Sequence, residues 1–250
     1  MIEQTKAGLS LMRFESLAGL PGLAHWVSTR QGGVSAAPFD SLNLGGGQDD
    51  PLKVTQNRQL LRLGLELPAM TWARQVHGVE IIEVGPDDNG SVGQADGLMT
   101  DAPGVGLLIK QADCQAVLLY APRRRALANL HVGWRGNVQN MPGRGVERLC
   151  RRYDVAPAEL HAAISPSLGP CCGQFVNWRD ELPAWFTSFR VHEDRFDLVA
   201  VTASQLRQAG VPAENIQASG LCTRCDRRFF SYRRDGRTGR FGTVAAISWE

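Results

Sequence analysis

The chain has 250 residues, 43% of them apolar and 21% charged, which is typical of a globular protein with one large domain or two small ones. Its 27 Lys and Arg residues nearly balance 25 Asp and Glu, and a net charge of +2 argues against bulk binding to nucleic acid or membranes. Six cysteines are too few for a disulfide scaffold, and neither a signal peptide nor a membrane-spanning stretch is evident. We therefore expect a cytoplasmic protein with reduced thiols.

Short apolar runs and helical patterns alternate along the chain. In chain order they predict a strand at 25–28, a helix at 51–63, strands at 79–84, 105–109, 116–120 and 126–132, a helix from 142, strands at 160–164 and 196–200, a helix at 201–209 and a strand at 243–249. Asp49 or Asp50 can cap the first helix, and Gly210 ends the last. Several strands are apolar throughout, as in sheets covered on both faces. The pattern predicts one α/β domain over residues 1–250.

Three segments place metal-capable side chains at strand ends beside glycine. His77 precedes a predicted strand, Cys114 lies between two strands, and His131 ends a strand that leads into a helix. Two imidazoles and one thiolate suit Zn²⁺ and leave a fourth position open, as in catalytic rather than structural zinc sites. Cu²⁺ is the second candidate ion, but five histidines are too few for blue-copper and trinuclear centres.

Two other interpretations of these residues stay open. Each residue has an ordinary structural role available: His77 in a loop, Cys114 as a small buried hydrophobe, and His131 as a core histidine. Alternatively, Cys114 and His131 form the nucleophile and base of a thiol hydrolase, with Asp113 or Gln111 orienting the imidazole.

Many short motifs, in one order, resemble the family once called polyphenol oxidase or multicopper laccase and more recently described as purine nucleoside phosphorylases. The motifs are STRQGGVS (28–35), SLNLG (41–45), QVHG (75–78), ADGLMT (95–100), ADC (112–114), HVGWRG (131–136), SPSLGPCC (165–172), CTRC (222–225) and FSYRRDGRTGR (230–240). In that family the zinc ligands are the His of QVHG, the Cys of ADC and the His before GWR. The resemblance thus implies His77, Cys114 and His131, the same residues that the chemistry selects.

The resemblance implies a four-layer α-β-β-α fold with mixed sheets, distantly similar to a toxin deamidase with a Cys–His pair. It implies phosphorolysis of adenosine, inosine and methylthioadenosine, together with hydrolytic deamination of adenosine. The implied partners are purine nucleosides and phosphate, in a monomer or small homo-oligomer. Two alternatives are an amidase, for example on cell-wall precursor peptides, and a metal-binding protein without catalysis.

Three departures from the family pattern concern the substrate. This chain has Gln111 and Gln115 where the family often has Thr and Leu around its ADC motif, and Gly173 where a Tyr often follows the cysteine pair. A lost Tyr would remove a stacking surface beside the substrate.

Four polar residues are the predicted substrate and phosphate contacts. Arg30 lies in a Gly- and Ser-rich turn that can bind an anion, and Arg135 follows His131 by four residues. Asn43 and Gln75 offer both donors and acceptors to a purine or ribose. Asp113 is expected to orient a ligand histidine. The arginine-rich segment 227–240 is a further candidate for anion recognition, with Arg233, Arg234 and Arg240 as weaker choices.

The remaining cysteines do not match a known motif. Cys222 and Cys225 form a C-x-x-C, but the second pair, Cys171 and Cys172, is adjacent, and no thioredoxin-like context surrounds either pair. Half of a structural zinc site and a redox pair are the alternatives, and we interpret all four as buried or loop thiols. The deaminase pattern H-x-E with P-C-x-x-C is absent, and the glycines at 45–47 lack the Lys-Ser/Thr of a P-loop.

Overall fold

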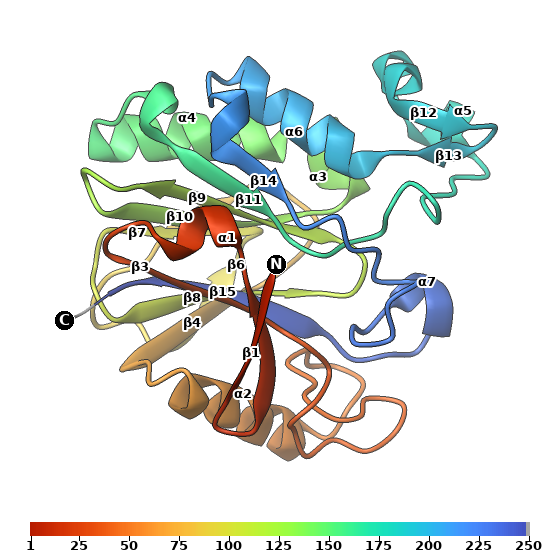
Figure 1. Ribbon diagram of the computed structural model, residues 1–250. Helices are drawn as coiled ribbons and strands as arrows, with labels where there is room; N and C mark the ends of the chain where they lie inside the picture. The colour runs from red at the N-terminus through yellow and green to blue at the C-terminus, as the bar shows by residue number, and fades with distance from the viewer. Residues whose placement is uncertain (249–250) are drawn as a thin grey trace.

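Two large mixed β-sheets lie face to face in the computed structural model, which describes residues 1–248 (Figure 1). The seven-stranded sheet has the order β1 (Ile2–Lys6), β2 (Leu9–Arg13), β3 (Leu23–Ser28), β15 (Phe241–Ile247), β8 (Val105–Gln111), β4 (Ala69–Arg74) and β6 (Gly90–Gln94). The six-stranded sheet has the order β14 (Ile216–Ala218), β11 (His161–Ile164), β9 (Gln115–Ala121), β10 (Ala126–Val132), β7 (Gly97–Thr100) and β5 (Ile81–Glu83).

Helices cover the outer face of each sheet. Helix α2 (Pro51–Gly64) lies on the seven-stranded sheet, whereas α4 (Met141–Tyr153) and α6 (Leu198–Gln208) lie on the six-stranded sheet, with the short α3 (Trp134–Val138) beside them (Figure 1). The layered α-β-β-α arrangement with mixed sheets is therefore confirmed. Among residues 1–248, no helix combines the length and apolar character needed to cross a membrane.

The central strands are apolar throughout because both of their faces are buried. Along β9, Leu118 and Tyr120 point into the core between the sheets, while Val117 and Leu119 point into the core under α4 and α6. This alternation follows the two-residue period of a strand. A third cluster, including Leu61 and Leu108, fills the space between α2 and the seven-stranded sheet.

Helix α2 begins at a cap that the sequence predicts, and α4 begins at one that it does not. The Asp50 carboxylate accepts a hydrogen bond of 2.9 Å from the Leu52 backbone N–H, with Pro51 in the first turn of α2. Helix α4 is capped by Asn140, whose side-chain oxygen accepts from the Gly143 N–H. Its apolar stripe, including Val146 and Leu149, packs against the six-stranded sheet.

The strand predicted at 196–200 is wrong. Only Phe196 is in a strand, the two-residue β13 (Arg195–Phe196) that pairs with β12 (Arg190–His192). Helix α6 already begins at Leu198 because the Asp197 carboxylate caps it by accepting from the Ala200 N–H at 2.9 Å. A short apolar run does not distinguish a buried strand from the start of a buried helix.

Some element ends and short elements differ from the prediction. The strand predicted at 243–249 is β15, and Trp249 lies outside the described residues. The pattern missed β1, β2, β4, β6, β7, β12 and β14. It also missed the short helices α1 (Glu15–Ala18), α5 (Trp178–Glu181) and α7 (Tyr232–Asp235) and the 3-10 turns Pro157–Glu159, Ala184–Phe189 and Ala213–Asn215.

A neutral histidine is built into the seven-stranded sheet. His25 of β3 is fully buried, and its Nε2 accepts a hydrogen bond of 2.9 Å from the Phe14 backbone N–H. Burial, and then the charge of Arg13, lower the pKa of His25 from 6.5 to about 3. The unfolded chain therefore binds a proton at this residue at pH values where the native state does not.

We predict that His25 contributes to acid sensitivity. The native pKa is below the unfolded value, so this contribution is complete above pH 6.5 and declines as the pH falls toward 3. Between pH 7 and 4.5 the unfolding free energy should fall by about 2.5 kcal/mol more in the native sequence than in His25→Gln, in which an amide oxygen can replace Nε2. Urea unfolding at both pH values measures this difference, with His192→Gln at an exposed position as the control. Equal pH dependence in the native protein and His25→Gln would contradict the prediction.

Candidate functional site

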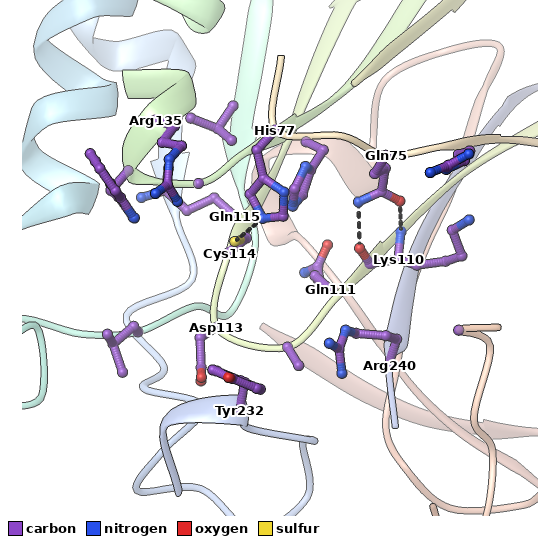
Figure 2. Close-up of a pocket in the computed structure, with 18 of the residues that line it drawn as sticks. Gln75, His77, Lys110, Gln111, Asp113, Cys114, Gln115, Arg135, Tyr232 and Arg240 are labelled. Atoms are coloured by element: carbon purple, nitrogen blue, oxygen red, sulfur yellow. Dashed lines mark hydrogen bonds between the residues drawn. The ribbon is translucent and has the colours of Figure 1, made fainter. Parts of the chain in front are cut away.

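Three segments from different strand ends bring His77, Cys114 and His131 together. His77 lies in the loop between β4 and β5, Cys114 in the turn between β8 and β9, and His131 near the end of β10. Their candidate ligand atoms all lie within 4.8 Å of one another, and Cys114 Sγ is 3.9 Å from His77 Nε2 (Figure 2). The His77 side is exposed and the His131 side is buried, so the cluster is open on one side.

A buried carboxylate holds two of these residues in place. Asp96 is fully buried, and its Oδ1 accepts a hydrogen bond of 2.7 Å from His131 Nδ1. The same carboxylate accepts from the backbone N–H groups of Val76, His77 and Gly78 at 3.1, 2.9 and 2.7 Å. Because Nδ1 is engaged, His131 directs its Nε2 toward the cluster, as a histidine ligand to a metal usually does.

Asp96, and not Asp113 as predicted, orients a histidine of the cluster. The Asp113 carboxylate instead accepts from Thr223 Oγ1, Ser231 Oγ and the Arg233 backbone N–H, at 2.7, 2.7 and 2.6 Å. These hydrogen bonds connect the Cys114 turn to the segment around α7. The backbone of Asp113 has a left-handed φ of 87°. The signal for Asp96 in the sequence is a lone carboxylate directly before the apolar strand β7, where burial requires a partner.

Gln111, the other residue considered for orienting the imidazole, is also engaged elsewhere. Its Nε2 donates to Ser165 Oγ at 2.7 Å, across the two sheets. Neither side chain beside Cys114 therefore orients the imidazole.

The charges of the cluster favour a thiolate. Burial opposes a charge on Cys114, but the adjacent His131 outweighs it and lowers the pKa of the Cys114 thiol. Burial likewise opposes a charge on His131, but Cys114 and Asp96 together raise the pKa of that imidazole. Burial also acts against ionised Asp96, and the hydrogen bonds from His131 and Gly78 nevertheless hold its pKa below the ordinary value. A deprotonated sulfur beside two imidazoles is both a ligand set for a soft cation and a nucleophile.

A glycine lets the backbone lie directly against these donors. A Cβ at Gly133 would lie 2.9 Å from Cys114 Sγ and 3.2 Å from His77 Cδ2. The residues therefore fit a metal ion: two imidazoles and a thiolate converge, Asp96 fixes one imidazole, and position 133 leaves the space that a side chain would fill.

The cluster forms part of the wall of a cavity of about 820 Å³, within the range of about 300–1,000 Å³ common for small-molecule sites. The lining includes four aromatic residues: Trp72, Trp134, Phe175 and Tyr232. It also includes six basic residues, Arg58, Arg74, Lys110, Arg135, Arg233 and Arg240, whereas Asp113 is the one carboxylate of the lining within residues 1–248. This charge imbalance favours an anionic ligand.

Two of the four predicted substrate residues line this cavity. Arg135 stacks over Trp134, with 4.1 Å between the guanidinium carbon and the ring centroid. Gln75 is fastened to the edge of β8: its amide donates to the Lys110 carbonyl at 2.7 Å and accepts from the Lys110 N–H at 2.9 Å (Figure 2). Gln75 thus forms part of the cavity wall, and both ends of its amide are already hydrogen-bonded to the backbone of Lys110.

Arg30 and Asn43 are not among the described residues that line the cavity. The Arg30 guanidinium forms an ion pair with Asp40 at 3.0 Å and stacks on Phe230. It therefore stabilises the turn between these residues. The Asn43 side chain donates to Asp49 and accepts from the Arg240 N–H, which fixes the loop that precedes β15. Both residues support loops near the cavity, whereas Arg233 and Arg240 of the arginine-rich segment reach the wall itself.

The structure also corrects the expectation for Gly173. Gly173 is not among the described lining residues, and a Cβ at this position would lie 2.4 Å from the Phe196 carbonyl oxygen. No side chain fits here without a shift of the backbone. Aromatic surface in the cavity comes from Phe175 and Tyr232 instead.

Fold and cluster together define a class: a layered protein of two mixed sheets with a His–Cys–His donor set at one end of the sheets. Residues 24–248 match the family model of the multi-copper polyphenol oxidoreductase laccases. The chain is 34% identical to a purine nucleoside phosphorylase of Deinococcus radiodurans, over 97% of this chain and 95% of the relative, and 37% identical to one of Xylella fastidiosa, over 91% and 93%. The solved structure of YlmD from Geobacillus stearothermophilus superposes with a TM-score of 0.87 at 33% identity, covering 99% of each chain.

The chain therefore belongs to the multi-copper polyphenol oxidoreductase laccase family, whose relatives here carry the name purine nucleoside phosphorylase. The resemblance inferred from the motifs is confirmed at the level of the family.

We predict that Gly133→Ala impairs metal binding while leaving the fold intact. The added methyl group would displace Cys114 Sγ or the His77 ring, because contacts of 2.9 and 3.2 Å are too close for carbon. After dialysis against a weak chelator, the zinc retained at the His77–Cys114–His131 cluster should fall severalfold, measured with Cys225→Ser present in both variants so that only this cluster is counted. Gly136→Ala is the matched control, since its Cβ would meet neighbours only at 3.6 Å and beyond. Equal zinc retention by the two variants would show that position 133 does not shape the site.

Proposed function

We propose that this chain is a zinc-dependent purine nucleoside phosphorylase, cleaving adenosine, inosine and methylthioadenosine with inorganic phosphate. The observation that carries the proposal is the position of the His77–Cys114–His131 cluster, which opens into a cavity lined by six cationic residues and four aromatic ones. The printed names of the relatives from Deinococcus radiodurans and Xylella fastidiosa support the same activity.

His77, Cys114 and His131 would hold the zinc ion through one nitrogen, one sulfur and one nitrogen. An ion held by these residues would supply Lewis acidity and would lower the pKa of water or another oxygen ligand. Asp96 supports this role because a hydrogen bond to Nδ1 raises the basicity of the opposite ring nitrogen.

Three basic side chains of the cavity are held by backbone carbonyls rather than by carboxylates. Arg240 donates to the carbonyls of Thr238 and Gly239 at 2.9 Å, Arg58 to the Leu44 carbonyl, and Lys110 to the Ala73 carbonyl at 2.9 Å. Carbonyl dipoles orient these groups without neutralising them as carboxylates would. Among the described lining residues, the Asp113 carboxylate already accepts three hydrogen bonds.

Lys110 supports the binding of an anion most directly. Burial, and then the nearby Arg58, lower the pKa of its ammonium group to about 7. A phosphate dianion beside Lys110 and Arg58 would relieve this repulsion and restore the charge on Lys110.

In the proposed reaction a phosphate oxygen bonds to C1′ of the ribose while the bond from C1′ to the purine nitrogen breaks. The departing purine takes up a proton, and the products are the free base and ribose 1-phosphate. The chain's contribution is to hold phosphate by its cations and to offer the aromatic side chains of the lining as stacking surfaces for the planar base. Water in place of phosphate, directed at the amino-bearing carbon of adenine, would give deamination of adenosine at the same site.

A thiol hydrolase or amidase is the second candidate, and one observation favours it. The lowered pKa of Cys114 and the raised pKa of His131 are those of a nucleophile and its base. This candidate requires no metal ion, so the effect of metal removal separates it from the phosphorylase.

We expect the zinc-loaded protein to release hypoxanthine from inosine and adenine from adenosine only when phosphate is present. Removal of zinc by a chelator should abolish the release, and added zinc should restore it. His131→Ala should lower kcat/KM by more than about a hundredfold, since even partners of metal ligands are worth about 10–100-fold. Chromatography of the reaction mixture measures free base, ribose 1-phosphate and deaminated nucleoside together.

His192→Ala, at an exposed histidine, is the matched control and should retain full activity. Folded, zinc-loaded protein that releases no base would exclude the phosphorylase. Turnover of amide substrates that survives chelation and is blocked by alkylation of Cys114 would establish the hydrolase instead.

Arg240→Met should raise the KM for phosphate by about tenfold to a hundredfold, because a hydrogen bond to a charged group is worth about 1.5–3 kcal/mol. The KM for the nucleoside should change little. Arg207→Met, at an exposed position of α6 outside the cavity, is the control. Initial rates at varied phosphate and fixed inosine measure both constants, and an unchanged phosphate KM would exclude Arg240 from the phosphate site.

A further inference from the structure

Four cysteines from two distant segments converge at one place near the surface. Cys171 and Cys172 follow β11, and Cys222 and Cys225 follow β14; β11 and β14 pair as parallel neighbours. All four sulfur atoms lie within 4.8 Å of one another, and all four thiols are free. Parallel pairing of β11 and β14 brings the segments after both strands to the same edge of the sheet, so the two cysteine pairs form one cluster.

The sulfur atoms have the spacing of a tetrahedral metal site. With Zn–S bonds of about 2.3 Å, neighbouring sulfurs in a tetrahedral site are about 3.8 Å apart. The distances between sulfur atoms are 3.6 Å for Cys171–Cys172, 3.8 Å for Cys171–Cys225 and 3.5 Å for Cys172–Cys225. These are much longer than the bond of about 2.05 Å in a disulfide.

Donors around the cluster suit thiolates. The Gly169 N–H points to Cys222 Sγ at 3.3 Å, and Arg224 Nη1 points to Cys172 Sγ at 3.5 Å. Gly169 also lets the two segments approach, because a Cβ there would lie 3.0 Å from Cys222 Cβ and 3.5 Å from Cys171 Sγ. Such N–H···S contacts stabilise metal-bound thiolates, and an arginine offsets part of the negative charge of four of them.

We propose that Cys171, Cys172, Cys222 and Cys225 bind a second zinc ion, at a structural site separate from the His77–Cys114–His131 cluster. Four protein sulfurs fill every position of a tetrahedral ion, so the site has no open position for substrate. Its adjacent cysteine pair departs from the usual C-x-x-C spacing, which explains why the motif is hard to recognise in the sequence.

The site would fasten two segments that build the cavity wall. The first segment carries Leu168 and Phe175 of the lining, and the second leads into Tyr232 and Arg233. Arg233 Nη1 donates to the carbonyls of Cys172 and Gln174, at 3.3 and 2.7 Å, so the cysteine loop directly holds a cation of the cavity. A metal ion that links two loops in this way contributes to their folding free energy.

Metal content measured under reducing conditions tests the proposal. Protein isolated with zinc as the only added metal should carry two zinc ions per chain, and His131→Ala should carry one. Cys225→Ser should also carry one, and the double variant none. Cys150→Ser, at a half-buried cysteine outside both clusters, should still carry two. In His131→Ala loaded with cobalt(II), the thiolate-to-metal absorption of a four-sulfur site should appear and disappear with Cys225→Ser.

Thiol reactivity gives a second measurement on His131→Ala that does not depend on the folding of a cysteine variant. With zinc bound, only Cys114 and Cys150 of the six cysteines should react with a thiol reagent before denaturation. The proposal is overturned if folded His131→Ala carries no zinc, if all its thiols react at once, or if mass spectrometry finds a disulfide among the four. Because this variant lacks the first site, the result is independent of whether the protein is a phosphorylase.

Discussion

The geometry of the His–Cys–His cluster depends on the buried charge of Asp96. A carboxylate removed from water must be matched by donors, and Asp96 accepts three backbone N–H groups from residues 76–78 and the Nδ1–H of His131. One side chain thus fixes the course of the His77 loop and the orientation of the second imidazole together. The left-handed φ of 61° at His77 is stabilised by the same contacts.

The two sheets supply what this arrangement needs: rigid strand ends from which short turns project. Cys114 lies in the turn between β8 of one sheet and β9 of the other, so it lies where the chain crosses between the sheets. Asp113, beside it, bonds to Thr223 and Ser231 and joins this turn to the cysteine-rich segment and α7. The candidate metal cluster, the cationic wall and the four-cysteine site are therefore linked through hydrogen bonds between loops rather than through one continuous element.

Local sequence signals predicted many of the helices and strands, whereas the roles of Asp96 and of the four clustered cysteines depend on contacts between distant segments. Asp50 with Pro51, and Gly210, are local signals, and the structure has α2 and α6 where they indicate. The His–Cys–His set came from motif resemblance and ligand chemistry. Asp96 and the paired cysteines escaped prediction because their roles depend on which strands are neighbours, such as β7 with β10 and β11 with β14. Arg30 and Asn43 show the converse: suitable chemistry in a loop does not place a side chain in a cavity.

Strand β15 has a consequence for how the chain reaches this state during synthesis. It lies between β3 and β8, and Thr243 pairs with Val27, a partner more than 200 residues earlier. The middle of the seven-stranded sheet cannot close on the ribosome until β15 has emerged, and β3 and β8 expose apolar edges until then. Arg240 directly precedes β15, so the cationic wall forms in the same late step. In the nascent chain, β3 and β8 therefore lack the strand that joins them for as long as residues 241–247 are not available.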